Sequence, residues 1–179
     1  MKHFYRDIEG RFDFQDVYSA AVKEAPHNAV FVEVGCWQGM STAYLAVEAI
    51  NSKKNISIHV VDNFMWTTER LPTPDAVYKQ FMENISPVSR VLTVHRQDSI
   101  KPLPLKSSSI DFVYIDGSHK RSAVLADIEH YMRYLKPGGV IAGHDYNKTH
   151  IDVRIAVAES FGFDYSVVHR SWVHRKRRV

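Results

Sequence analysis

Cysteine is nearly absent from this sequence: Cys36 is the single one in 179 residues, which excludes an internal disulfide. Chains without disulfides are typical of reducing compartments, so we expect a cytoplasmic protein. Long apolar runs are also missing, since none approaches the roughly 20 residues that a membrane-spanning helix needs. Charges interrupt residues 1–16 every few positions, unlike a secretory signal peptide. We therefore expect no membrane among the partners of the chain.

A strong excess of one charge is lacking as well, because the formal net charge is only +3. The excess lies in residues 169–179, which contain no acid and the following basic side chains: Arg170, Arg175, Lys176, Arg177 and Arg178. A cluster of this kind can bind nucleic acid. It can equally be a solvated tail or an edge strand that its charges protect from pairing. We favour the second interpretation because the rest of the chain is nearly neutral.

Short β-branched apolar runs alternate with helix-like stretches, without repeats, low-complexity tracts or long linkers. The pattern predicts strands over residues 29–34, 56–61, 90–95, 110–115 and 139–143, and helices over 41–50, 75–85, 122–135 and 153–161. Two final strands fall within 163–177 and turn near Arg170 and Ser171. This alternation predicts a doubly wound α/β sheet covered on both faces. We expect one domain over 1–179, with its core in 29–179 after an N-terminal helical segment, 1–28.

The first strand runs into a glycine loop that opens a helix, with Glu33, Gly35 and Gly39 in the pattern E-x-G-x-x-x-G. A nicotinamide dinucleotide site would have G-x-G-x-x-G, with the pyrophosphate at the helix N-terminus. An acid just before the first glycine repels a pyrophosphate but suits a cationic ligand. S-adenosylmethionine has an ammonium and a sulfonium and no phosphate. The loop therefore favours S-adenosylmethionine over NAD, although it could also be a plain strand-to-helix turn.

The next two strand ends supply groups for a nucleoside. Asp62 ends the second strand at the spacing at which an acid accepts hydrogen bonds from ribose hydroxyls. Asp98 and Ser99 end the third strand, one strand over, where we expect contact with an adenine ring. Aromatic and thioether side chains near these ends, which line the pocket or pack in the core, are Trp37, Phe64, Met65 and Trp66.

Carboxylates and imidazoles concentrate after the fourth and fifth strands. Asp116 and His119 follow the fourth, and His144 and Asp145 follow the fifth. We interpret these four as the catalytic centre, with His119 as general base. Asp116, His144 and Asp145 also form a candidate site for a divalent metal such as Mg²⁺. The alternative is that they line the pocket without a metal, with His119 as a capping or structural residue.

Other features have simpler interpretations at this stage. Four other histidines are not clustered in the sequence, and we assign them to surface or strand positions: His27, His59, His130 and His150. Cys36 is interpreted as a small packing residue of the glycine loop. Lys136-Pro137-Gly138-Gly139 predicts that the preceding helix stops and that the chain turns tightly into the fifth strand.

Taken together, the segments EVGCWQG, VVDNF, QDS, FVYIDGSH, LKPGGVIAGHDY and VRIAVAESFG cover about residues 29–162. In this order they resemble class I S-adenosylmethionine-dependent methyltransferases, and more narrowly the small group (methyltransferase family 24) with D-G-x-H and G-H-D-Y elements. The resemblance implies a seven-stranded Rossmann-like sheet of order 3-2-1-4-5-7-6, with strand 7 antiparallel. Some metal-dependent O-methyltransferases of this fold have acids or amides where His144 stands, so this chain departs from them.

The resemblance implies an enzyme that O-methylates a small hydroxylated acceptor, such as a sugar or a natural product. One alternative is a nucleic-acid methyltransferase that uses the basic C-terminal residues, although the chain lacks an Asn/Asp-Pro-Pro-Tyr/Phe element. Another is a non-catalytic S-adenosylmethionine-binding module. The glycine spacing and the Lys-Pro-Gly-Gly element both disfavour an NAD-dependent reductase. A homo-oligomer is left open.

Overall fold

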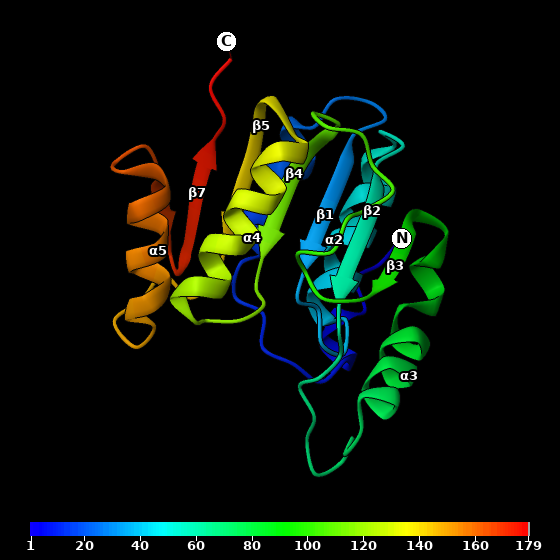
Figure 1. Cartoon of the computed structure of the whole chain (residues 1–179). Helices are drawn as coiled ribbons and strands as arrows, with labels where there is room; N and C mark the ends of the chain where they lie inside the picture. The colour runs from blue at the N-terminus through cyan, green and yellow to red at the C-terminus, as the bar shows by residue number, and fades with distance from the viewer. Residues whose placement is uncertain (179) are drawn as a thin grey trace.

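The structure is a computed structural model that describes residues 1–178, and it contains one seven-stranded mixed sheet (Figure 1). The strands are β1 Val30–Val34, β2 Ser57–Asp62, β3 Leu92–Arg96, β4 Ile110–Ile115, β5 Leu135–Gly143, β6 Ser166–Val168 and β7 Ser171–Arg175. Their order is β3-β2-β1-β4-β5-β7-β6, and β7 is antiparallel to both of its neighbours. The resemblance predicted this order and this antiparallel strand, and both are confirmed.

Helices cover both faces of the sheet. They are α1 Gln15–Glu24, α2 Met40–Ser52, α3 Pro74–Ile85, α4 Arg121–Tyr134 and α5 Ile151–Phe161, with short 3₁₀ turns at η1 Tyr5–Asp7 and η2 Ser86–Val91. In Figure 1, α4 and α5 lie in front of the sheet and α2 lies behind it. Within residues 1–178 no helix has both the length and the apolar character needed to cross a bilayer.

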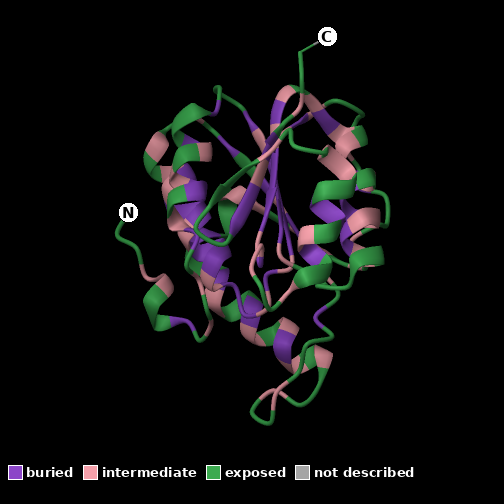
Figure 2. Ribbon diagram, turned by 90° about the vertical axis from the view of Figure 1, so that its left-hand side faces the viewer, coloured by how far each residue is buried: buried purple, intermediate pink, exposed green. Residues whose placement is uncertain are grey.

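Side-chain alternation along the strands produces two cores, one on each face. In β1, Phe31 packs with residues of α1, α2 and α3, whereas its neighbour Val32 packs with residues of α4 and α5. Both side chains are buried, because a strand in the centre of a covered sheet has no solvent-facing side. Figure 2 shows buried residues along the sheet and on the inner sides of the helices. The continuous apolar run that predicted β1 reflects this burial.

The fifth strand begins earlier than the sequence predicted. The helix ends at Tyr134, but Leu135 already pairs with Ile110, and the register then shifts so that Phe112 pairs with Val140. The Lys-Pro-Gly-Gly segment is thus an irregular start of β5 rather than a turn that precedes it. Gly138 has a φ of +82°, which suits this bulge because glycine adopts positive φ without steric strain.

The basic C-terminal residues are engaged within the fold. β7 lies between β5 and β6, so it is an inner strand and not the charge-protected edge that we considered. Arg175 pairs with Glu24 of α1, and the Lys176 ammonium donates to the carbonyl oxygens of Met132 and Leu135 at 2.7 and 2.8 Å. Lys176 therefore caps the end of α4, a use of its charge that needs no external partner.

We predict that Gly143→Ala destabilises the fold. A Cβ at this position would lie 2.5 Å from Trp172 Cζ2 and 2.6 Å from the Ile115 carbonyl oxygen. Overpacking of this kind costs about 1–3 kcal/mol, which urea unfolding would measure. Gly117→Ala is the matched control, because its Cβ would meet nothing closer than Val34 Cγ1 at 4.0 Å. Equal stability of the two variants would contradict the close packing of β5 against β7.

Candidate active site

The carboxyl ends of β1, β2, β3, β4 and β5 lie at one edge of the sheet, the lower edge in Figure 1. This is the edge at which parallel α/β sheets bind ligands. The predicted site residues occupy these strand ends or the loops that follow: Glu33, Gly35, Gly39, Asp62, Asp98, Ser99, Asp116, His119, His144 and Asp145. They form two groups, one around the glycine loop and one after β4 and β5.

Both predicted glycines of the loop are required by the backbone. Gly35 has a φ of +81°, and a Cβ there would lie 2.2 Å from the carbonyl oxygen of Asp116. The loops after β1 and β4 are therefore packed directly against each other. Gly39 has a φ of +89°, and its Cβ would lie 2.9 Å from Ile85 Cγ2. Any side chain at either position would disturb the loop that is expected to hold the cofactor.

Glu33 is a fully buried acid beneath this loop. The Tyr18 hydroxyl donates to it at 2.8 Å, and the Thr42 hydroxyl donates to its other carboxylate oxygen. Burial raises the pKa of Glu33 above its ordinary value, although the hydroxyl donors act in the opposite direction. Sequence reasoning missed Tyr18, which comes from the N-terminal helix α1. The Glu33 carboxylate and its hydroxyl donors therefore lie next to the glycine loop, for which we expect a cationic ligand.

The Asp62 carboxylate holds the glycine loop in shape. Its Oδ2 accepts from the backbone N–H groups of Cys36 and Trp37 at 2.8 and 3.0 Å, and its Oδ1 accepts from the Phe64 N–H at 2.6 Å. A carboxylate has about four lone-pair positions, so one acceptor position remains for a ribose hydroxyl. The glycine loop and Asp62 thus fit a nucleoside-containing cofactor, and the contact with ribose stays a prediction.

Asp98 and Ser99 lie at the end of β3, beside this group. Asn63 donates from its side-chain amide to Asp98 Oδ1 at 3.0 Å, and Asp98 is exposed. The Ser99 carbonyl oxygen accepts from the Tyr131 hydroxyl of α4 at 2.8 Å. Their contact with adenine also stays a prediction.

The predicted aromatic wall divides in two. Phe64 is buried in the core against Tyr78 and Phe81. Trp66 is 71% exposed and stacks on Trp37 of the glycine loop, with ring centroids 5.2 Å apart. Met65 is exposed as well, so Trp37, Met65 and Trp66 can face a bound molecule, whereas Phe64 cannot.

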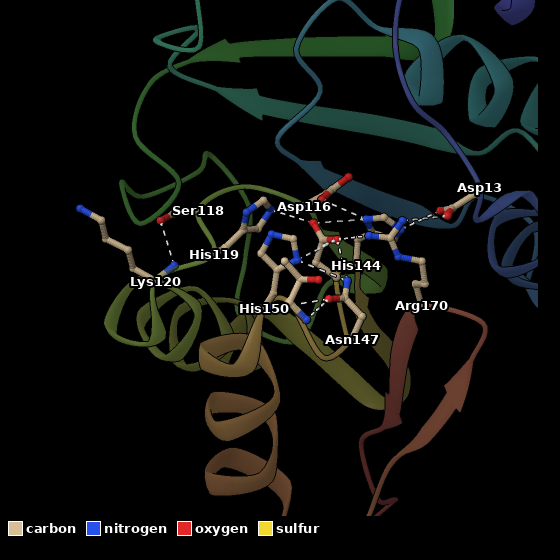
Figure 3. Close-up of polar contacts among 11 residues, drawn as sticks. Asp13, Asp116, Ser118, His119, Lys120, His144, Asn147, His150 and Arg170 are labelled. Carbon is tan, nitrogen blue, oxygen red and sulfur yellow. Dashed lines mark hydrogen bonds and ion pairs between the residues drawn. The ribbon is translucent and has the colours of Figure 1, made fainter.

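The second group brings the four predicted catalytic residues together; Figure 3 labels Asp116, His119 and His144, and Asp145 contacts both histidines. His119 Nε2 lies 2.9 Å from Asp145 Oδ2. His144 Nδ1 lies 3.5 Å from the same Asp145 oxygen and 3.7 Å from Asp116 Oδ1. Asp145 is only 7% exposed and has a φ of +57°, so its backbone bends to direct the carboxylate into this cluster.

The cluster also contains three residues that sequence reasoning missed. Asp13, which precedes α1, contacts His144 Nε2 through Oδ1 at 2.7 Å, and Arg170 reaches Asp145 Oδ1 at 2.9 Å. His150 Nδ1 lies 3.3 Å from Asp145 Oδ1, so assigning His150 to a plain surface position was wrong. Its place a few residues after Asp145, before α5, was the available signal. Asp13 and Arg170 gave none.

The cluster separates its charges. Burial raises the pKa of Asp116 to about 7, with His144 acting in the opposite direction. Burial would also raise the pKa of Asp145, but hydrogen bonds from His119 and His144 bring it well below its ordinary range. The hydrogen bond to Asp145 in turn raises the pKa of His119. The Asp145 carboxylate is thus ionised at neutral pH, and His119 keeps its proton to a higher pH than a free imidazole does.

Two sets of side chains have ligand atoms close enough for one metal ion: Asp116, His144 and Asp145, and also His119, Asp145 and His150. In each set the atoms lie within 4.8 Å of one another. Mg²⁺ prefers oxygen ligands and retained water, whereas imidazole suits transition-metal ions. The first set, with two carboxylates and one imidazole, fits a divalent cation, but its imidazole departs from the oxygen set that Mg²⁺ prefers.

The sheet order, the glycine loop and the acids at successive strand ends define a class I S-adenosylmethionine-dependent methyltransferase. Residues 32–146 match the model of the methyltransferase domain family, and the chain belongs to that family. No curated protein sequence matches the chain.

Solved structures share the fold at low sequence identity. An S-adenosylmethionine-dependent O-methyltransferase from Thermotoga maritima has a TM-score of 0.67 at 12% identity, covering 96% of this chain and 68% of that one. The TDP-rhamnose 3'-O-methyltransferase of calicheamicin biosynthesis has a TM-score of 0.65 at 16% identity, covering 90% and 76%. Haemonchus contortus phosphoethanolamine N-methyltransferase 1, solved with phosphoethanolamine and S-adenosylhomocysteine, has a TM-score of 0.51 at 17% identity, covering 76% and 27%.

We predict that His119 titrates above its ordinary pKa of 6.5 and that Asp145→Asn lowers this pKa, because the amide is a weaker partner for the imidazolium. NMR titration of the imidazole C–H resonances would measure both values. His95, on β3, is the control and should titrate at the same pH in both proteins. An unchanged His119 midpoint in Asp145→Asn would contradict the pairing.

Proposed function

We propose that the protein is an O-methyltransferase that transfers the methyl group of S-adenosylmethionine to a small hydroxylated acceptor, with His119 as general base. The observation that carries this proposal is the 2.9 Å contact between His119 Nε2 and Asp145 Oδ2. If Nε2–H donates to the carboxylate, Nδ1 keeps its lone pair and can take a proton. The His119 side chain is 43% exposed, so an acceptor hydroxyl can reach it.

Methyl transfer is an in-line displacement at a methyl group that the sulfonium already activates. The protein must therefore align the acceptor and remove its proton. In the proposal, Glu33 and the loop of residues 35–39 bind the methionine part, and Asp62 binds the ribose. Asp98 and Ser99 bind the adenine. This arrangement directs the sulfonium towards the ends of β4 and β5, where His119 lies.

The set of Asp116, His144 and Asp145 would hold a divalent cation beside the acceptor. A bound cation there would lower the pKa of the acceptor hydroxyl. Asp13 supports this role, because its contact with His144 Nε2 leaves Nδ1 directed at the two carboxylates. A carboxylate that binds the other ring nitrogen of a ligand histidine and so orients it is common at metal sites.

A sugar or a natural-product scaffold is the acceptor class that we favour. The fold neighbour from calicheamicin biosynthesis acts on TDP-rhamnose, which supports a sugar without identifying one. The stacked pair of Trp37 and Trp66 beside the glycine loop offers an apolar ring face to such a molecule.

Replacing His119 by alanine should slow methyl transfer about 10²–10⁴-fold, the usual effect of losing an acid–base group. The assay is S-adenosylhomocysteine release over a panel of sugar nucleotides and phenolic acceptors, with cofactor affinity as the control. If a cation in the Asp116 set is required, EDTA should abolish turnover and spare cofactor binding. Full activity in both His119→Ala and Asp145→Ala would contradict the assignment of this cluster.

Asp62→Ala should weaken S-adenosylhomocysteine binding by about 1–3 kcal/mol, because the ribose loses a charged acceptor and the loop loses its backbone contacts. Calorimetry would measure this affinity. A titration with NAD should give no more heat than a titration with buffer alone. Asp75→Ala is the control, since Asp75 is an exposed acid on α3 that pairs with Arg96. Tighter binding of NAD than of S-adenosylhomocysteine would overturn the cofactor assignment.

A further inference from the structure

We propose that His119, Asp145 and His150 form a separate site for a divalent transition-metal ion such as Zn²⁺, and that an ion bound there inhibits the enzyme. This set shares only Asp145 with the set of Asp116, His144 and Asp145. The binding of the ion is independent of the proposed function, whereas the inhibition rests on the role of His119 as base.

The spacing of the three side chains suits one ion. Asp145 lies 2.9 Å from His119 Nε2 through Oδ2 and 3.3 Å from His150 Nδ1 through Oδ1. With metal–ligand bonds of about 2.0–2.2 Å, two ligand atoms of a tetrahedral ion are about 3.3–3.6 Å apart, so the His150 contact already has this spacing and the His119 contact would lengthen by about half an ångström. The two rings have centroids 4.4 Å apart and are tilted by 54°. Two imidazoles and one carboxylate are a donor set that transition-metal ions accept and Mg²⁺ does not favour.

Asn147 holds His150 with a lone pair towards the carboxylate. Its Oδ1 accepts the backbone N–H groups of Thr149 and His150 at 2.8 and 3.1 Å, which fixes the orientation of the amide. The amide nitrogen must then point to Asp145 Oδ1 at 3.1 Å and to His150 Nδ1 at 3.3 Å. In the tautomer in which Nδ1 accepts from Asn147, the His150 lone pair and the Asp145 carboxylate lie on the same side, where one cation can contact both.

Other neighbours orient the carboxylate without filling the site. Arg170 donates to Asp145 Oδ1 at 2.9 Å, and Oδ2 faces His119 at 2.9 Å and, less closely, His144 at 3.5 Å. Figure 3 shows His119 and His150 on one side of the cluster and the pair of Arg170 and Asp13 on the other. Contacts that orient ligand side chains in this way are a regular part of metal sites.

Occupation of this site would change the tautomer of His119. A neutral imidazole that binds metal through Nε2 carries its one proton on Nδ1, the atom that the proposed mechanism needs as proton acceptor. The ion therefore removes the general base without touching the cofactor. In this way the level of a transition metal would control methyl transfer.

The test is a calorimetric titration of untagged protein with ZnCl₂, without cofactor, in a His95→Ala background. This background removes the other pair of adjacent imidazoles, His59 and His95, whose ring nitrogens are 2.9 Å apart. His150→Asn removes the third ligand and keeps a residue that is favourable before a helix. Its melting temperature should match that of the parent.

We expect one Zn²⁺ per chain, an affinity at least about 10–100-fold weaker in His150→Asn, and little change in Asp116→Asn. MgCl₂ should not displace the bound zinc. Unchanged affinity in His150→Asn would overturn the site. A loss in Asp116→Asn as large as that in His150→Asn would mean that the ion uses the other set, and would also overturn it.

Activity gives a second, separable result. Zn²⁺ should inhibit the parent enzyme, and His150→Asn should lose this inhibition when the rate of each protein is compared with its own zinc-free rate. Equal inhibition of both proteins would contradict the proposal. If no acceptor is methylated, the proposed function fails, but the zinc titrations still decide whether the metal site exists.

Discussion

The geometry of the candidate site depends on the compensation of one buried anion, the Asp145 carboxylate. A buried charge is tolerated only when partners surround it, and here they come from separate parts of the chain. His119 follows β4, His150 precedes α5, and Arg170 lies in the turn between β6 and β7. Each partner therefore fixes the position of its own segment relative to β5. The same contacts that compensate the charge of Asp145 also hold these loops in place.

The fold was predictable because its signals are local or shared by a family. The apolar run of β1 and the helical spacing of α4 are visible in the sequence, and the order of the strands followed from the resemblance. The irregular start of β5 was not visible. Pro137 and Gly138 are local signals of a turn, whereas the pairing of Leu135 with Ile110 depends on the neighbouring strand. Tertiary pairing prevailed over local chain preference at that point.

The site was predictable only where it lies at strand ends. Parallel strands bring their carboxyl ends to one edge, so Asp116 and Asp145 could be grouped without knowledge of any contact. The sequence around Asp13 and Arg170 does not indicate that either side chain reaches the site. Their contacts form because the segment before α1 and the turn between β6 and β7 both pack beside the end of β5. The environment of His119 was equally hidden, because its protonation depends on Asp145, which is distant in sequence.

One consequence concerns the order in which the molecule is built. Asp13 contacts His144 across 131 residues and Arg170 across 157, so both contacts close very long loops. Such contacts form only after the intervening chain has been ordered, since the entropy of loop closure has to be met first. The sheet can thus assemble before the cluster exists. Loss of the Asp13 contact would then free His144 Nε2 while the sheet stays intact, because Asp13 precedes α1 and belongs to no strand. Arg170, in contrast, is held in the turn that joins β6 to the inner strand β7, so one contact of the site is less durable than the fold.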